Sequence, residues 1–428
     1  MVNIPHWPKI PIWDIPRKPS LDLSFKLLEL MGNPHKKLPH TIHIAGTNGK
    51  GSTLAMLKSI FVQAGYKVHS YTSPHLLEFN ERINLTGQSI TDSHLYDVLE
   101  RTKIVADKHD LSPTFFEGAT AAAFLAFSEN DADILLLETG LGGRLDCTNV
   151  IQNPIATIIT PISYDHMEYL GSDILQIASE KAGIIKRNVP CIIGIQESSV
   201  YELLINKCDE LSSPSFCYEY DYCAKNTNSG FEYKSQKFNI HFPYPSLEGD
   251  HQVLNASTVI AAITLLNDKF KVTTSQIIQG LTSTTWHGRL QLVDKEKTKA
   301  LTVRDNIQIY LDGAHNDAAA ASLANWAKGN IEGNLYLLVG MTRNRYASSF
   351  CRYFKDVATH GFAVNVESEP SSYSADIMAE KARESGIEFT SADSITDALQ
   401  KISTLNKKDP TTILVTGSLF LISDFMKL

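Results

Sequence analysis

The stretch that decides the fold is HIAGTNGKGST, residues 43–53, which runs from a short apolar segment through a glycine-rich turn into a helical pattern. Glycines in such a turn let backbone N–H groups approach an anion at a helix N-terminus, where the helix dipole favours negative charge. A lysine there supplies charge for the outer phosphates of a nucleotide, and a hydroxyl residue can meet Mg²⁺. The stretch therefore predicts a strand, a phosphate-binding loop and a helix. Its residues are Gly46, Gly49, Lys50 and Gly51, with either Ser52 or Thr53 as the hydroxyl.

The spacing of this loop departs from the standard phosphate-binding pattern. Two residues separate Gly46 from Gly49, where the standard pattern has four, and Gly51 stands before the hydroxyl residue. The alternative is an ordinary glycine-rich turn with a solvated lysine. Because strand, turn, helix, lysine and hydroxyl all coincide, we favour phosphate binding.

The chain around this loop alternates apolar runs with helical patterns, from residue 41 to about residue 195. Each run is bounded by Gly, Pro or Asp, and helical stretches lie between several of them. This alternation predicts a parallel sheet with helices on both faces. The strand-like runs are residues 41–45, 66–72, 133–138, 155–160 and 189–195.

Two further regions follow this series. Residues 197–248 become rich in Tyr, Lys and Asn around the turn signal NSG, which predicts a small antiparallel insertion. The later runs IQIYLDG, NLYLLVG, FAVNVE and TTILVTG alternate with helical segments and predict a second α/β domain. We place the domain boundary after residue 292, so that the two domains span residues 1–292 and 293–428.

Composition narrows the function classes. A chain of 428 residues with a net charge of −8 lacks the basic character that nucleic-acid binding usually needs. No run approaches the roughly 18 apolar residues of a membrane span, and residues 1–18, with their Pro and Trp, are expected to pack as an N-terminal arm. The six cysteines show neither CxxC nor zinc-type spacing, which favours reduced thiols and a cytoplasmic location.

Several strand-like runs end on residues that can serve a bound nucleotide. Glu138 ends one run, Ser73 follows another, and Asp165 with His166 follows a third. Because the carboxyl ends of parallel strands share one edge of a sheet, we expect these side chains to lie beside the phosphate loop. A carboxylate there holds Mg²⁺ directly or through water. Taken singly, each residue is also compatible with a structural or solvated role, as is Lys181 in the helical segment EKAGIIK.

The second half of the chain holds three short polar constellations, HQVLNA, WHGRLQ and LDGAHND. Asp312 ends an apolar run and can accept hydrogen bonds from ribose hydroxyls, and Arg289 can bind phosphate. Spacing alone leaves a structural role equally open for each constellation.

These motifs, in this order, resemble the folylpolyglutamate synthase/dihydrofolate synthase family of Mur-type ligases. The resemblance rests on GTNGKGS, TSPHL, ETGLGGRLDCTN, DHMEYLG, EKAGIIK, HQVLNA, WHGR and DGAHN within residues 21–316, and the glycine before the hydroxyl is the family's own form. It implies an N-terminal P-loop-type Mur-ligase domain with a small antiparallel excursion, and a smaller Rossmann-like C-terminal domain.

The resemblance also implies a reaction and a site. ATP would convert a folate-type carboxylate to an acyl phosphate, from which the amine of L-glutamate displaces phosphate to form an amide. Two Mg²⁺ ions and a carbamylated Lys181 are expected to assist. Nucleotide contacts would be Gly49, Lys50, Gly51, Ser52, Asn255, Arg289, Asp312 and His315; metal ligands Ser52, Ser73, Glu138 and His166; and catalytic residues Lys50, His166 and Lys181.

The stretch TFFE, which precedes the helical segment ATAAAFLAF, favours a pterin as the acceptor. Two aromatic rings offer flat surfaces for a pterin, and an acid can accept from its N–H groups. Adjacent aromatics at a helix start are also common in cores. The resemblance places 7,8-dihydropteroate against Thr114, Phe115, Phe116, Glu117, Leu145, Asp146 and Cys147.

We therefore predict a monomeric, bifunctional enzyme that makes dihydrofolate and also extends folyl-glutamates. One alternative is folylpolyglutamate synthase activity alone, and another is a peptidoglycan Mur ligase with a nucleotide-sugar acceptor. A third is a phosphate-loop ATPase or nucleotide sensor without ligation, for which ADP release would not depend on glutamate.

Overall fold

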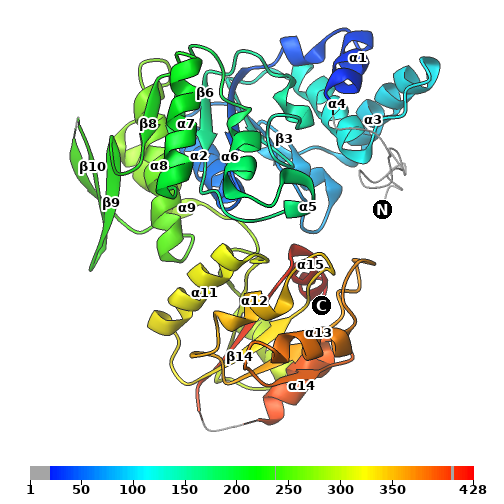
Figure 1. Cartoon of the computed structure of the whole chain (residues 1–428), viewed down its shortest axis with the longest axis vertical. Helices are drawn as coiled ribbons and strands as arrows, with labels where there is room; N and C mark the ends of the chain where they lie inside the picture. Colours follow the sequence, from blue (N-terminus) through cyan, green and yellow to red (C-terminus); the bar gives the residue numbers. More distant parts are fainter. Residues whose placement is uncertain (1–19, 237, 406–408) are drawn as a thin grey trace. The chain divides into compact units, whose positions relative to one another are not determined.

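The chain divides into two compact units (Figure 1). The computed structural model describes residues 20–236, 238–405 and 409–428, so the predicted N-terminal arm lies outside the described residues. The first unit holds the chain up to Ser246 together with Gln252–Thr284, and the second holds Leu247–His251 and Thr285–Leu428. Across the described ranges, no helix is both long enough and apolar enough to cross a lipid bilayer.

The first unit is built on an eight-stranded sheet with the order β4-β3-β2-β5-β1-β6-β7-β8. Strands β2, β5, β1, β6, β7 and β8 run parallel, which confirms the predicted parallel sheet, whereas β3 and β4 form an antiparallel edge. Sequence analysis missed this edge because its strands are too short to show a period. The bounds are β1 His40–Ala45, β2 Val68–Tyr71, β3 Ile83–Leu85, β4 Gln88–Ser89, β5 Ile134–Glu138, β6 Ala156–Ile159, β7 Cys191–Ile193 and β8 Ser215–Cys217.

Helices cover both faces of this sheet. Successive side chains of a strand point to opposite faces, yet every residue of β5 is buried. Leu135 and Leu137 belong to a hydrophobic cluster that includes buried residues of α3 and α4, while α2 also contacts β5. The helix bounds are α1 Asp22–Leu30, α2 Lys50–Gln63, α3 Asp92–Lys108, α4 Phe115–Ser128, α5 Met167–Leu170, α6 Ile174–Ala182, α7 Ser198–Glu210, α8 Asp250–Leu266 and α9 Thr274–Ser283, with 3-10 helices η2 Pro34–Lys36, η3 Phe79–Arg82 and η4 Cys147–Val150.

The predicted antiparallel insertion over residues 197–248 is wrong in its first part. Helix α7 packs through Val200, Leu204 and Cys208 in the same hydrophobic cluster as α6, and β8 then extends the main sheet. The polar composition of the whole stretch hid this helical period. The true antiparallel sheet comprises β9 Tyr222–Thr227, β10 Gly230–Ser235 and β11 Asn239–Phe242, and the NSG turn joins β9 to β10 as predicted.

The second unit contains a six-stranded sheet with the order β12-β13-β17-β14-β15-β16, parallel except for β12. The predicted second α/β series is therefore confirmed. The strands are β12 Gln291–Leu292, β13 Ile307–Leu311, β14 Asn334–Val339, β15 His360–Ala363, β16 Phe389–Ser391 and β17 Thr411–Thr416; the helices are α10 Lys295–Thr302, α11 Asp317–Asn330, α12 Ala347–Arg352, α13 Ala375–Arg383, α14 Ile395–Thr404 and α15 Leu419–Met426.

Gly280 of α9 lies directly against α2, the helix that begins at the phosphate loop. A Cβ at this position would lie 2.5 Å from Ile60 Cγ1 and 2.6 Å from Ile60 Cα, and backbone atoms cannot move aside cheaply. We expect Gly280→Ala to destabilise the first unit by about 1–3 kcal/mol, measured as a lower urea midpoint. Gly329→Ala in α11, where a Cβ meets nothing within 4 Å, is the control and should not destabilise. Equal midpoints for native protein and Gly280→Ala would contradict this packing argument.

Candidate active site

The phosphate loop lies between the end of β1 and the start of α2, at the edge where the parallel strands end. Strands β2, β5, β1 and β6 are neighbours in the sheet, so their carboxyl ends lie side by side. Ser73 follows β2, Glu138 ends β5, and Asp165 with His166 follows β6. The structure thus places these residues along one edge, as the sequence predicted.

Two glycines let the loop turn close to its neighbours. Gly46 has a φ of 150°, and a Cβ there would overlap Thr160 Oγ1 just after β6. Gly49 has a φ of 86°, and a Cβ there would lie 2.5 Å from Asn255 Oδ1. Both positions therefore require glycine. The tight turn leaves the N-terminus of α2 as a site where an anion is favoured.

Two lysine ammonium groups converge on one backbone carbonyl of this loop. Lys50 Nζ donates to Gly46 O at 3.1 Å and to Thr47 O at 3.2 Å, and Lys181 Nζ donates to Gly46 O at 2.9 Å. Lys181 is buried, and its burial, followed by the positive charge of Lys50, lowers its pKa to about 7. The arrangement concentrates positive charge where an anionic group would be stabilised.

Two amide side chains of α8 reach the start of α2. Gln252 Nε2 donates to Ser52 Oγ at 3.3 Å, and Asn255 Nδ2 donates to Gln252 Oε1 at 3.0 Å. The hydroxyl of Thr53, the other candidate for Mg²⁺, is buried and has no hydrogen-bond partner among the described residues. Sequence analysis named Asn255 and missed Gln252. The spacing of three residues on one helix face was the signal that could have found it.

Glu138 and Ser73 lie beside each other at adjacent strand ends. The Ser73 N–H donates to Glu138 Oε2 at 3.4 Å, and Glu138 is buried. His166 has a left-handed backbone at the start of α5, and its N–H donates to Asp165 Oδ1 at 2.8 Å. Within the part of the chain that the structure describes, no three His, Cys, Asp or Glu side chains form a metal-binding group. The predicted ligands still suit Mg²⁺, which keeps water and substrate phosphates as ligands beside few carboxylates.

The buried carboxylate of Asp146 holds the glycine-rich loop that follows Glu138. Its Oδ2 accepts from the N–H groups of Gly140 and Leu141, both at 2.9 Å. Its Oδ1 accepts from the N–H of Thr148 at 3.0 Å and from the Thr148 hydroxyl at 2.5 Å. These donors use the four lone-pair positions of a carboxylate. The acid expected to bond a pterin therefore already binds its own loop.

Other predicted pterin contacts lie at the start of α4. The Thr114 N–H donates to Glu117 Oε2 at 2.8 Å and the Glu117 N–H donates to Thr114 Oγ1 at 3.2 Å, which makes these two residues a capping box. The ring of Phe116 lies so close to Gly140 that any Cβ there would overlap it. Phe116 thus connects α4 with the loop that Asp146 holds.

Phe115 faces a different neighbour from Phe116. Its ring centroid lies 5.7 Å from that of Phe79, and the Arg82 guanidinium carbon lies 5.4 Å from each of these two centroids. Leu145 is half-buried, and Cys147 is buried in surroundings that raise the pKa of its thiol well above the ordinary value. The thiol is therefore unsuited to act as a nucleophile.

The second unit carries its own cluster of predicted residues. Asp312, at the end of β13, is buried and accepts two backbone N–H groups, each at 2.8 Å. Burial lowers the pKa of His251, Asp312 raises it and Arg289 lowers it, so these three side chains share one electrostatic environment. His315 Nδ1 lies 2.8 Å from a backbone carbonyl oxygen. His251 stands in the HQVLNA motif but was not predicted as a site residue.

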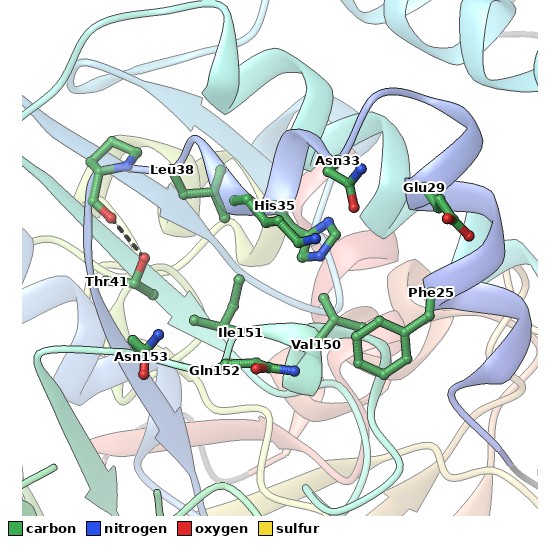
Figure 2. A pocket seen from close by; sticks show the side chains of 12 residues that line it. Phe25, Glu29, Asn33, His35, Leu38, Thr41, Val150, Ile151, Gln152 and Asn153 are labelled. Carbon is green, nitrogen blue, oxygen red and sulfur yellow. Dashed lines mark hydrogen bonds between the residues drawn. The ribbon is translucent and has the colours of Figure 1, made fainter. Parts of the chain in front are cut away.

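A cavity of about 530 Å³ lies at the other end of the first unit's parallel strands, where β1 begins (Figure 2). Its walls come from α1, η2, the start of β1 and the segment after η4. Thr41 lies near the start of β1 whereas the phosphate loop follows the end of that strand, so the cavity is separate from the predicted nucleotide site. The lining residues include Phe25, Glu29, Asn33, His35, Leu38, Val150, Gln152 and Asn153.

The chain is similar to several known proteins. The chain matches the Mur ligase middle domain over residues 44–263 and the Mur ligase glutamate ligase domain over residues 288–419. It is 32% identical over 423 residues to the dihydrofolate synthase/folylpolyglutamate synthase of Bacillus subtilis, covering 96% of this chain and 95% of that protein. Its structure is similar to E. coli FolC in complex with DHPP and ADP, with a TM-score of 0.85, 27% identity, and coverage of 96% of this chain and 93% of that one. A bifunctional folylpolyglutamate synthase/dihydrofolate synthase with Mn, AMPPNP and L-glutamate bound gives a TM-score of 0.82, 25% identity, and coverage of 96% and 94%.

Replacement of Lys50 tests the phosphate loop. We expect Lys50→Ala to abolish ADP formation while leaving the melting temperature close to the native value, because the hydrogen bonds of this side chain go to loop carbonyls and not to the core. Lys58→Ala, two turns further along α2, is the control and should retain ADP formation. A native turnover rate for Lys50→Ala at saturating ATP would contradict the assignment of this loop as the phosphate-binding site.

Proposed function

Because this chain belongs to the dihydrofolate synthase/folylpolyglutamate synthase family of Mur ligases, we propose that it acts on both 7,8-dihydropteroate and folyl-glutamates. It is an ATP-dependent, amide-forming ligase that joins L-glutamate to a folate-type acceptor. The observation that carries the site assignment is the glycine loop at the end of β1, where Lys50 and Lys181 both donate to Gly46 O.

The reaction divides into two displacement steps. A carboxylate oxygen of the acceptor attacks the γ-phosphorus of ATP, the bond from that phosphorus to the bridging oxygen breaks, and ADP leaves. Lys50, at the N-terminus of α2, stabilises the charge on the phosphoryl oxygens. The glutamate amine then attacks the acyl carbon, the carbon–oxygen bond to phosphate breaks, and the amine loses a proton. Both steps require exclusion of water, which would hydrolyse the acyl phosphate.

ATP and a divalent cation take part in this reaction. The finer assignment is two Mg²⁺ ions, held by Ser52, Ser73, Glu138 and His166. When bound, Mg²⁺ neutralises phosphoryl oxygens and so lowers the barrier to displacement. Two observations support these ligands: Glu138 and Ser73 are already adjacent, and Ser52 stands in the first turn of α2. Arg289, Asp312 and His315, with Asn255, stay the predicted contacts to the nucleotide.

The proposal includes carbamylation of Lys181. Carbon dioxide adds to the neutral amine, and a pKa of about 7 makes that form abundant at neutral pH. The product carries a carboxylate-like group in place of a buried ammonium. Such a group would balance the charge of Lys50 and approach Mg²⁺.

The pterin assignment rests chiefly on Phe116, which lies against the loop after Glu138. Thr114, Glu117 and Asp146 have structural tasks of their own, in a helix cap and in the loop. They stay predicted contacts together with Phe115, Leu145 and Cys147. The names of the relatives favour two folate activities over one, and a folate over a nucleotide sugar.

We also propose a cytoplasmic location and a monomeric state. All six cysteines are free in the structure, which suits a reducing, cytoplasmic compartment. A monomer stays our prediction for the oligomeric state.

Product formation tests the proposed function. With 7,8-dihydropteroate, ATP and L-glutamate, we expect dihydrofolate and one ADP for each amide formed, and with reduced folate monoglutamates we expect extension of the glutamate chain. Extension of folates alone would show that the dihydrofolate synthase half is wrong. ADP release that does not depend on glutamate would favour the nucleotide sensor instead.

Replacement of Phe116 tests the pterin assignment within that assay. We expect Phe116→Ala to raise the KM for 7,8-dihydropteroate and leave the KM for ATP near its native value. Phe127→Ala, in the buried part of α4, is the control and should lower stability without this selective effect. Equal changes in both KM values would assign Phe116 to the core.

Replacement of Lys181 tests the carbamate. We expect Lys181→Ala to be nearly inactive and acetate to restore part of the activity, because acetate can supply the missing carboxylate. Native enzyme depleted of bicarbonate should regain activity faster above pH ~7 than below it, since the neutral amine becomes abundant as pH rises through the lowered pKa. Lys207 of α7, a half-buried lysine that pairs with Glu210, provides the control substitution. Full activity of Lys181→Ala would contradict the proposal.

A further inference from the structure

Three side chains form a buried hydrogen-bonded row beneath the glycine-rich loop. His43 comes from the middle of β1, Thr148 from η4, and Asp146 from the end of the loop. His43 Nε2 lies 2.8 Å from Thr148 Oγ1, and the Thr148 hydroxyl donates to Asp146 Oδ1 at 2.5 Å. All three residues are buried.

The direction of the protons in this row follows from its chemistry. The Thr148 hydroxyl has one hydrogen, which it gives to Asp146, so the Thr148 oxygen must accept from His43 Nε2–H. His43 is therefore the neutral tautomer with an unprotonated Nδ1, and this buried atom has no hydrogen-bond partner within residues 20–236, 238–405 and 409–428. Burial, and then the charge of Lys186, lowers the His43 pKa to about 3, so the ring stays neutral at physiological pH.

The far end of the row fixes the loop. Asp146 Oδ2 accepts from the N–H groups of Gly140 and Leu141, which ties the start of the loop to its end. Gly140 lies against Phe116, and a Cβ on Gly143 would lie 2.8 Å from Glu180 O and 2.9 Å from Lys181 O. The loop also begins directly after Glu138. One loop thus touches three features of the proposed site: the pterin-facing ring, the modified lysine's helix and the metal-binding carboxylate.

We propose that His43 and Thr148 are positioning residues for the ligase reaction, which orient Asp146 so that it holds this loop in its active arrangement. The inference rests on the proposed function. Neither residue touches a substrate; both act through the loop. Loss of the Thr148 hydroxyl takes the acceptor from the buried His43 N–H and leaves Asp146 Oδ1 with the Thr148 N–H in place of two donors. An unsatisfied buried donor is costly, and the loop relieves that cost by moving.

Thr148→Val tests this proposal because it removes the hydroxyl at nearly constant volume. We expect the KM for 7,8-dihydropteroate to rise about tenfold or more, with a smaller change in the KM for ATP. Thr148→Ser keeps the hydroxyl and His43→Gln keeps an N–H donor, so both variants should hold the KM for 7,8-dihydropteroate near its native value. The control is Thr102→Val, at a buried threonine of α3 whose hydroxyl donates to Val98 O. This substitution should lower stability without the selective KM change.

Hydrogen exchange gives a second readout that does not need activity. In the native chain the Gly140 and Leu141 amides should be protected, and Thr148→Val should lower their protection selectively while Thr102→Val leaves it unchanged. Failure of the native chain to form the amide would overturn the proposed function alone. Identical kinetics and identical amide protection in Thr148→Val and native protein would overturn the positioning role.

Discussion

Two lysine ammonium groups share one backbone carbonyl, Gly46 O, and the rest of the site depends on that pairing. Lys50 reaches it from the start of α2 and buried Lys181 reaches it from the end of α6. A single carbonyl dipole cannot balance two positive charges, and the burial of Lys181, followed by the charge of Lys50, lowers the pKa of the Lys181 ammonium. A bound triphosphate and the proposed carbamate would both supply negative charge at this point. Nucleotide binding and carbamylation of Lys181 would therefore both reduce the excess positive charge at Gly46 O.

The fold creates this pairing through a close approach of backbones. Gly46 turns where β6 leaves no space for a Cβ, so the loop can bend onto α2 and bring its carbonyl toward α6. The strand order β2-β5-β1-β6 lines up Ser73 and Glu138 on one side of the loop and His166 on the other. The loop after Glu138 completes the edge, and the carboxylate of Asp146 holds that loop. The proposed chemistry depends on these loops and side chains lying together where the parallel strands end.

Two kinds of feature could be predicted from the sequence: single motifs, and residues that a parallel sheet brings together at the ends of its strands. The phosphate loop, the central strands and the convergence of Glu138, Ser73 and His166 follow from glycine chemistry, apolar runs and the rule that parallel strands end at one edge. Helix α7 and strand β8 were missed because a polar composition masked a helical period. The saturation of Asp146 by four donors, the capping box of Thr114 with Glu117, and the contact of Gln252 with Ser52 depend on the positions of atoms that spacing alone does not give.

The most direct test of this electrostatic account is carbon-13 NMR of the native chain equilibrated with ¹³C-labelled bicarbonate. The account predicts one carbamate resonance that is present in active enzyme, disappears on acidification and is absent from Lys181→Met, whose buried side chain has no amine. A fully active native protein without a carbamate resonance would contradict it, because the second positive charge on Gly46 O would then need no negative partner of its own.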